Sequence, residues 1–290
     1  MDYLDSMLVA ESEWLDLACQ SSKENKQVLL DIKENLNQFY DTYNSIIEKD
    51  TIKPIVPDFI GKNQKAALID FYKSPPSLLK EKLQNRRNKD NLLDVCPYCG
   101  NRGIPNTLDH FIPKDDYPHY AIFENNLVPQ CRDCASIKGS FYFEDGKGCF
   151  FLHPMYHDAL SKIIFKFDLV FEPNSEQVEL TNSKLKLIEK LSDYEKFRVQ
   201  KHILKLNVKE RITTYCQKEF LLLKNKATRH NFPLEKLIAG KICITDTIGK
   251  DWESAFYEAL NNCEEAKNFL NRKMLNKLLC INTHDVIATN

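Results

Sequence analysis

Apolar side chains recur at helical spacing in the N-terminal part of the chain. Across residues 5–47 they return every three or four positions among acids and lysines, which predicts two helices or one interrupted helix. Prolines at 54 and 57 end this pattern, and a further helix is expected over residues 62–72. Ser77, directly after two prolines, is a candidate cap for the helix that follows.

The C-terminal half carries a strand pattern and then returns to helical spacing. Residues 162–173, KIIFKFDLVFEP, alternate well enough for a strand, and the turn-forming cluster after them leads into a second expected strand at 177–180. The remainder is predicted to be helical. It comprises KLKLIEKL at 184–191, the stretch from Ser192 to about Lys226, and the segment that begins at Asp251.

Between these regions, residues 92–156 are rich in cysteine, glycine, proline and aromatic side chains in short apolar runs, which helices do not explain. We therefore predict a mostly helical α+β protein in three parts. Residues 1–90 form a helical region, residues 91–160 form the functional module, and residues 161–290 form a strand pair followed by helices.

Composition and charge leave several functions open. A chain of 290 residues with 43% hydrophobic side chains can bury a core, but its net charge of −1 supplies no overall field for a polyanion. Contact with nucleic acid would therefore need local cations, and residues 80–89 offer five, although a solvated helix face is the more common explanation of such a segment. With acids at the N-terminus and no run of about 18 apolar residues, we expect a cytoplasmic protein outside the membrane.

Two closely spaced cysteine pairs predict a metal site. Cys96-Pro-Tyr-Cys99-Gly and Cys131-Arg-Asp-Cys134 are separated by 31 residues, and four thiolates suit the tetrahedral shell of a structural Zn²⁺. Such a shell has no open position for catalysis, so the zinc is expected to hold the fold. The other six cysteines are expected to be buried thiols: Cys19, Cys149, Cys216, Cys243, Cys263 and Cys280.

Further motifs lie between and after the cysteine pairs. They are Leu-Asp-His-Phe-Ile-Pro-Lys at 108–114, Asn-Leu-Val-Pro at 126–129 and Lys-Gly at 138–139. Together with the cysteines, this pattern over residues 96–139 resembles the HNH endonuclease family. The resemblance implies a ββα-metal fold, two strands and a helix around one divalent cation, that hydrolyses phosphodiester bonds of DNA or RNA.

Asp109 and His110 are the candidate catalytic residues. A neutral imidazole can take a proton from water, and a carboxylate can bind a hard cation such as Mg²⁺ or Mn²⁺ that polarises the phosphate. The resemblance places Asn126 on the loop behind the histidine, where its amide would hold His110 in position. A lone Asp-His pair is also found at ordinary strand ends, and Asn125-Asn126 is also ordinary turn chemistry.

Three cations are expected to contact phosphate: Lys114, Arg132 and Lys138. For Lys138, a solvated position on a helix is the alternative.

Ala135 departs from the family pattern. Members usually carry His or Asn directly after the fourth cysteine as the second protein ligand of the catalytic cation, and a methyl group cannot coordinate. Ser136 and Asp133 are candidate substitutes. Three explanations remain open: a rearranged natural site, an inactive member, or a deliberate substitution. The main rival function is accordingly a catalytically inactive zinc-stabilised module that binds nucleic acid or a partner protein.

A subset of the family resembles this chain in the Asp-His-Phe and Tyr-Pro phrases and in the His-Pro-aromatic segment at 153–156. That subset includes HNH partners of ATPases in Septu-type anti-phage systems, which implies a defence role and an ATPase partner. His153 is then a candidate accessory residue of the active site. A hydrogen-bonded packing histidine is the alternative for His153 and for His119.

Overall fold

The computed structural model describes residues 1–89, 93–244 and 246–274, which divide into two compact units. Unit 1 contains residues 1–161 and 191–206, and unit 2 contains residues 162–190 and the described residues from Asn207 onward. The described helices before residue 90 and the cysteine-rich module therefore share one unit.

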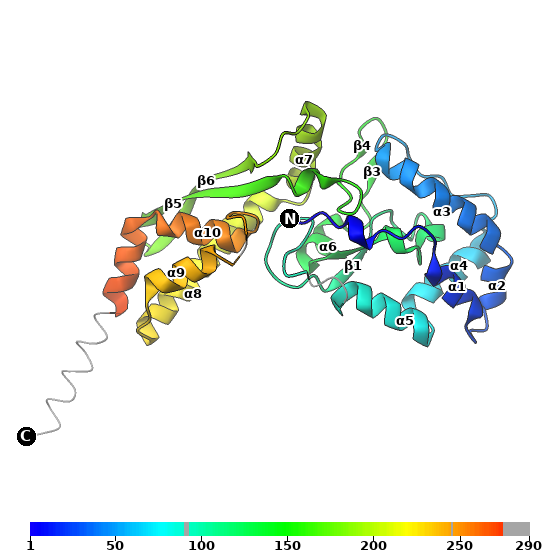
Figure 1. Ribbon diagram of the computed structural model, residues 1–290, viewed down its shortest axis with the longest axis horizontal. Coiled ribbons are helices and arrows are strands. Elements are labelled where there is room, and N and C mark those ends of the chain that lie inside the picture. The colour runs from blue at the N-terminus through cyan, green and yellow to red at the C-terminus, as the bar shows by residue number, and fades with distance from the viewer. Residues whose placement is uncertain (90–92, 245, 275–290) are drawn as a thin grey trace, which may run out of the picture. The chain divides into compact units, whose positions relative to one another are not determined.

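Unit 1 is mostly helical, with two short antiparallel strand pairs, β1–β2 and β3–β4 (Figure 1). Its helices are α1 (Glu13–Gln20), α2 (Lys26–Leu30), α3 (Lys33–Glu48), α4 (Lys62–Lys73), α5 (Ser77–Gln84), α6 (Arg132–Lys138) and α7 (Asp193–Lys205). Its strands are β1 (Thr107–His110), β2 (Leu127–Gln130), β3 (Phe143–Glu144) and β4 (Gly148–Cys149). Ser77 is the first residue of α5 and not its cap, which is Pro76.

The module has a ββα order. Strand β1 pairs antiparallel with β2, so that Asp109 lies opposite Val128 and His110 lies opposite Leu127. Helix α6 follows β2 directly and packs against β1. This order agrees with the two strands and one helix that the family resemblance implies.

Helix α3 supports the loop between β1 and β2. Tyr40 and Tyr43 lie on its buried face, at the spacing that predicted a helix. The Tyr40 ring stacks on Phe123 with centroids 4.1 Å apart, and the Tyr43 ring meets Tyr120 edge-on at 5.1 Å. Such aromatic pairs add to the stability that burial of the rings supplies. Helix α3 therefore holds the loop between β1 and β2 from outside the module.

Unit 2 is a long β-hairpin with helices. Its elements are β5 (Ile163–Glu172), β6 (Gln177–Leu187), α8 (Val208–Arg229), α9 (Leu234–Ile242), α10 (Trp252–Asn261) and a helical stretch over 264–274. The prediction of a helix at 184–191 is wrong, because β6 continues to Leu187 and pairs with Ile163. Cross-strand pairing supplies hydrogen bonds that local apolar spacing does not reveal. The predicted helix from Ser192 to Lys226 is interrupted at Asn207, whose φ is 49°.

Among the described residues, no helix has both the length and the apolar character needed to cross a bilayer. Cys19, Cys149 and Cys216 are buried as predicted. The prediction is wrong for Cys243, which is exposed, and Cys263 is half-buried. Cys280 lies outside the described residues.

Candidate active site and metal centre

The four paired cysteines converge on one point of unit 1. Their sulfur atoms all lie within 4.8 Å of one another, and Cys99 Sγ is 3.9 Å from Cys131 Sγ. Tetrahedral zinc with Zn–S bonds of about 2.3 Å requires sulfur atoms roughly 3.8 Å apart. The cysteines therefore fit a structural zinc ion. In the part of the chain that the structure describes, no other group of three or more His, Cys, Asp or Glu side chains gathers in this way.

Local turns bring these sulfurs together. Gly100 has a φ of 76°, which favours glycine, and its N–H donates to the Cys96 carbonyl at 2.9 Å to close the first knuckle. Cys131 is the N-cap of α6, so Cys134 falls in the first turn of that helix. The Cys131 N–H also donates to Cys96 Sγ at 3.4 Å. The neighbouring thiols, which hydrogen-bond to the Cys131 sulfur, lower its pKa and favour its thiolate.

Asp109 is a buried carboxylate with two protein donors. Its Oδ2 accepts a hydrogen bond from the Tyr98 hydroxyl at 2.7 Å, and its Oδ1 lies 2.9 Å from Lys138 Nζ. The side chain of Lys138 has no exposed surface, and its Nζ also donates to the His110 carbonyl at 3.1 Å. The placement contradicts both sequence readings of Lys138. It is the ion-pair partner of Asp109, and it lies too deep to contact phosphate or to be a solvated cation.

The geometry around His110 assigns its tautomer. Its Nε2 lies 3.0 Å from the Ala121 carbonyl, which only accepts hydrogen bonds, so the neutral ring carries its proton on Nε2 and its lone pair on Nδ1. Burial lowers the pKa of His110 to about 3, and the nearby Lys114 adds to this shift while the bond to Ala121 opposes it. The Tyr72 ring packs edge-on against the imidazole at 4.3 Å. The ring is thus fixed and neutral.

Asn126 pins the loop that follows His110. Its Oδ1 accepts hydrogen bonds from the Ile112 N–H at 2.7 Å and the Tyr43 hydroxyl at 2.9 Å. Its Nδ2 donates to the carbonyls of Ile112 at 2.9 Å and Tyr120 at 3.1 Å. These bonds go to the loop backbone and to Tyr43 of α3, so Asn126 fixes the loop that follows His110.

Asp109, His110 and Ala135 line the same cleft, which has a volume of about 200 Å³. Ala135 therefore occupies the place at which the family pattern puts a second cation ligand. The other residues that line the cleft are Leu108, Pro113, Lys114, Asp115, Gln130, Gly139 and Ser140. Lys114 thus lines the cleft, whereas Arg132 and the candidate substitutes Ser136 and Asp133 lie on exposed positions of α6 outside this lining.

Three residues near Asp109 and His110 were absent from the sequence prediction. Tyr72 lies on α4, Tyr98 lies inside the first cysteine knuckle, and Gln130 ends β2. Tyr98 lies within the Cys96–Cys99 motif, and its place in that motif was the one feature of the sequence that could have indicated it. For Tyr72 and Gln130 no local pattern indicates the site, because tertiary packing alone brings them to it.

His153 does not join the active site. Its Nε2 lies 3.0 Å from the Asn125 carbonyl, and its Nδ1 accepts a hydrogen bond from the Met155 N–H at 3.2 Å. Both ring nitrogens thus hydrogen-bond to backbone inside the core. His153 is therefore a hydrogen-bonded packing histidine and not an accessory residue of the cleft. His119 is also fully buried and lies among aromatic rings, 4.1 Å from that of Tyr120.

We predict that the protein loses stability in acid, because five histidines of unit 1 have lowered pKa values. Burial lowers the pKa of all five imidazoles, which are those of His110, His119, His153, His157 and His202. The pKa falls to about 3 for His110 and to about 4 for His119, His157 and His202. Above pH 6.5 both folded and unfolded chains hold neutral rings. Below it the unfolded chain binds more protons, so the free energy of unfolding falls as the pH falls toward 4. One pKa unit is worth about 1.4 kcal/mol, so each histidine contributes at most about 2 kcal/mol between pH 6.5 and 5.

Thermal melting of the zinc-loaded protein from pH 7.5 to 5 tests this expectation. A His202→Gln variant should take up as much as one proton fewer on unfolding, so its melting temperature should depend less on pH. The glutamine amide can replace both hydrogen bonds of the ring, the one to the Tyr98 carbonyl and the one from the Leu152 N–H. The exposed His230→Gln variant is the matched control. A melting temperature that stays constant over this range would contradict the prediction.

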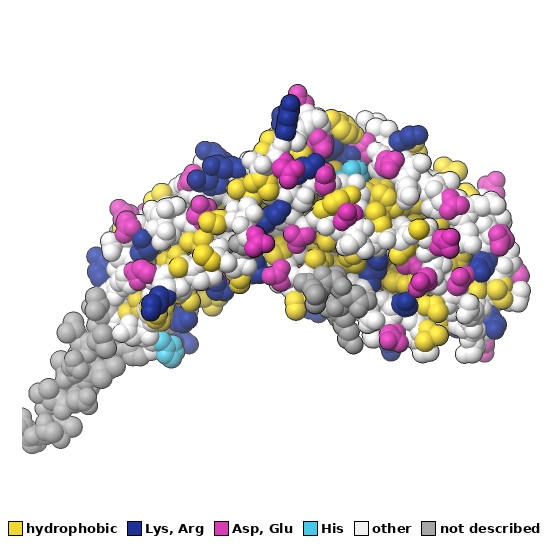
Figure 2. Space-filling model, viewed as in Figure 1, with side chains coloured by type: hydrophobic (Ala, Val, Ile, Leu, Met, Phe, Trp, Pro, Cys, Tyr) yellow, Lys and Arg dark blue, Asp and Glu magenta, His cyan; other side chains and the backbone are white. Residues whose placement is uncertain are grey.

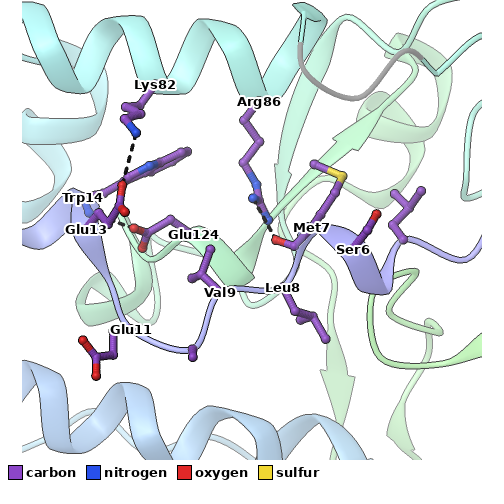
Figure 3. A pocket seen from close by; sticks show the side chains of 12 residues that line it. Ser6, Met7, Leu8, Val9, Glu11, Glu13, Trp14, Lys82, Arg86 and Glu124 are labelled. Carbon is purple, nitrogen blue, oxygen red and sulfur yellow. Dashed lines mark hydrogen bonds and ion pairs between the residues drawn. The ribbon is translucent and has the colours of Figure 1, made fainter.

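A second, larger cavity of about 690 Å³ shares no lining residue with the cleft. Figure 3 shows Arg86 reaching across it toward the Met7 carbonyl, and Lys82 reaching toward Glu13. Arg86 also donates to the Leu127 carbonyl at 2.8 Å, so it ties the N-terminal segment to β2. Arg86 is buried and bound to backbone, and the basic segment 80–89 is therefore not a continuous phosphate-binding face.

Comparisons with known proteins found similarity to a phage protein and to one family model. Protein ea31 of Escherichia phage lambda is 29% identical over 140 residues, which are 46% of this chain and 45% of that protein, so the match spans less than half of the relative's length. Among solved structures, none gave a significant match. Residues 96–141, which carry the four cysteines and the Asp109–His110 cleft, match the family model of the HNH endonucleases, and this module is therefore similar to a family of nucleases.

Proposed function

We propose that this protein is a metal-dependent endonuclease in which His110 activates water and Asp109 binds a divalent cation. The observation that carries the proposal is the fixed tautomer of His110. The Ala121 carbonyl accepts the Nε2 proton, which leaves Nδ1 as the basic nitrogen of the ring. His110 and Asp109 line the same cleft.

Hydrolysis of a phosphodiester needs a base for the attacking water and positive charge near the leaving oxygen. Because its pKa lies far below neutrality, His110 is unprotonated and able to accept a proton at physiological pH. A bound phosphate would bring negative charge to the cleft, which raises that pKa toward the value that suits a base. A divalent cation beside Asp109 would polarise the phosphate and stabilise the leaving oxygen.

Local cations supply the contact with nucleic acid. The face drawn in Figure 2 mixes acidic and basic side chains, in keeping with the net charge of −1. Near the cleft, Lys114 Nζ lies 5.7 Å from the centre of the Tyr72 ring, and Arg87 hydrogen-bonds to the Tyr72 hydroxyl. We infer that Lys114 and Arg87 hold the phosphate, with Arg132 contributing from the exposed face of α6.

A cleavage panel tests this function. The zinc-loaded protein is incubated with supercoiled plasmid, single-stranded DNA and total RNA, with Mg²⁺, with Mn²⁺ and without added cation. We expect cleavage of at least one substrate that requires the added cation. Intact substrates under every condition would count against a nuclease and in favour of a binding module.

Ala135 favours the second candidate function, a zinc-stabilised module that binds nucleic acid or a protein without cutting. It also yields a prediction, because Ala135 lines the cleft and a ligand introduced there would face the cation. Ala135→His or Ala135→Asn is expected to raise the Mg²⁺-dependent cleavage rate, by about tenfold or more. Ala135→Ser tests side-chain size with a weaker ligand. Equal rates in all four proteins would contradict a ligand role for this position.

We further propose a role as an effector in anti-phage defence that acts with an ATPase partner. The support is the resemblance of the Asp-His-Phe, Tyr-Pro and His-Pro-aromatic phrases to the nucleases of Septu-type systems. Co-purification of the native complex tests it. A stable ATPase companion is expected, and recovery of the nuclease by itself would count against the partner.

A further inference from the structure

Gln130 is a buried amide without a hydrogen-bond partner. It is the last residue of β2, its exposed fraction is 0%, and neither Oε1 nor Nε2 of its side chain is hydrogen-bonded. Buried polar groups nearly always find partners, since each unsatisfied group costs about 1–3 kcal/mol. Gln130 also lines the cleft of Asp109 and His110. An unpartnered amide at this place points to a ligand that the amide binds.

The strand register puts Gln130 beside Asp109. Gln130 lies opposite Thr107, and side chains two apart on a strand share a face, so Asp109 and Gln130 are diagonal neighbours on one face of the pair. Helix α6 begins two residues after Gln130 and brings Ala135 into the same cleft. The three positions converge although they lie on three different elements.

Asp109 needs help to hold a dication. Its Oδ1 already pairs with the Lys138 ammonium and its Oδ2 accepts from Tyr98, so part of its charge is compensated. Asp115 and Ser140 also line the cleft, but both are exposed, and the Asp115 carboxylate lies 3.7 Å from Lys114 Nζ. A buried amide oxygen is a hard, neutral ligand of the kind that Mg²⁺ and Mn²⁺ accept.

We propose that Gln130 Oε1 is the second protein ligand of the divalent cation, in place of the side chain that Ala135 lacks. The inference rests on the proposed function, because the cation is the one that hydrolysis at Asp109 and His110 requires. It gives the rearranged site a specific residue and removes the need for Ser136 or Asp133, which lie on exposed positions outside the cleft lining.

Mn²⁺ titration of the zinc-loaded full chain, followed by the electron paramagnetic resonance signal of free Mn²⁺, tests the inference. Gln130→Met keeps the length of the side chain but removes its oxygen, and it is expected to weaken Mn²⁺ binding at least about tenfold. Gln130→Glu supplies an anionic oxygen and should tighten binding. The exposed Gln217→Met variant of unit 2 is the control and should bind as the wild type does.

A melting curve in the absence of Mn²⁺ provides a second readout. Because Gln130→Met removes two unsatisfied polar atoms from the core, the variant should melt at the same temperature as the wild type or higher. This result would also show that the variant folds.

Two results would overturn the inference: Mn²⁺ affinity unchanged in Gln130→Met, or no Mn²⁺ binding by the wild type at millimolar concentrations. Cleavage assays on the same samples separate the two proposals. Mg²⁺-dependent cleavage together with unchanged Mn²⁺ affinity in Gln130→Met removes the role of Gln130 and keeps the nuclease. Gln130-dependent Mn²⁺ binding without cleavage by any variant keeps the cation site and removes the nuclease.

Discussion

Replacement of His110 by glutamine is expected to lower the rate of phosphodiester cleavage about 10²- to 10⁴-fold, the range that a positioned general base contributes. A glutamine amide can still donate to the Ala121 carbonyl and fill most of the space beside Tyr72. It has no basic nitrogen, however, so the loss would report the missing proton acceptor. Single-turnover rates with saturating protein measure the effect on the chemical step.

His119→Gln is the matched control. His119 is buried in the same unit, and burial lowers the pKa of its imidazole too, but it does not line the cleft. We expect this variant to cleave at the wild-type rate if it keeps its zinc and its melting temperature. Equal losses in the His110 and His119 variants would show that the effect comes from the fold, and a fully active His110→Gln would remove His110 from the mechanism.

Loss of zinc is expected to unfold the ββα module. Structural zinc contributes on the order of 10 kcal/mol in small modules, which is comparable to the whole stability of a typical domain. Helix α6 has only seven residues and starts at a cysteine ligand, so it cannot persist alone in water. Cys134→Ser should therefore lower the melting temperature sharply, release zinc and abolish cleavage together.

Cys243→Ser controls for the loss of a thiol, because Cys243 is exposed and lies in unit 2. Zinc content by mass spectrometry and melting by circular dichroism are measured on the same samples. A Cys134→Ser protein that melts like the wild type would contradict a structural role for the metal.

Local patterns were sufficient to predict that the four paired cysteines converge and where strand β1 of the module ends. Each cysteine pair forms a knuckle from residues three apart, so its geometry depends on nearby backbone and the motif is informative by itself. The helices at 33–48 and 62–73 also follow from their apolar spacing. In these cases the decisive contacts are close along the chain or repeat with the helical period.

Contacts between distant residues were not predictable in the same way. The Tyr43 hydroxyl of α3 reaches Asn126, 83 residues later, and Lys138 turns inward to Asp109 across 29 residues. A lysine near a helix end is ordinarily solvated, and only the buried carboxylate and the His110 carbonyl explain why this one is not. The role that we propose for Gln130 depends likewise on strand register.

The most direct test of the central claim observes binding and cleavage in one sample. Labelled plasmid fragment and RNA are incubated with saturating wild-type protein or His110→Gln in the presence of Mg²⁺, and intact complex is separated from cleaved product. We predict cleaved product with the wild type and intact complex with His110→Gln. Intact complex with both proteins would contradict the account and identify the chain as a nucleic-acid-binding module.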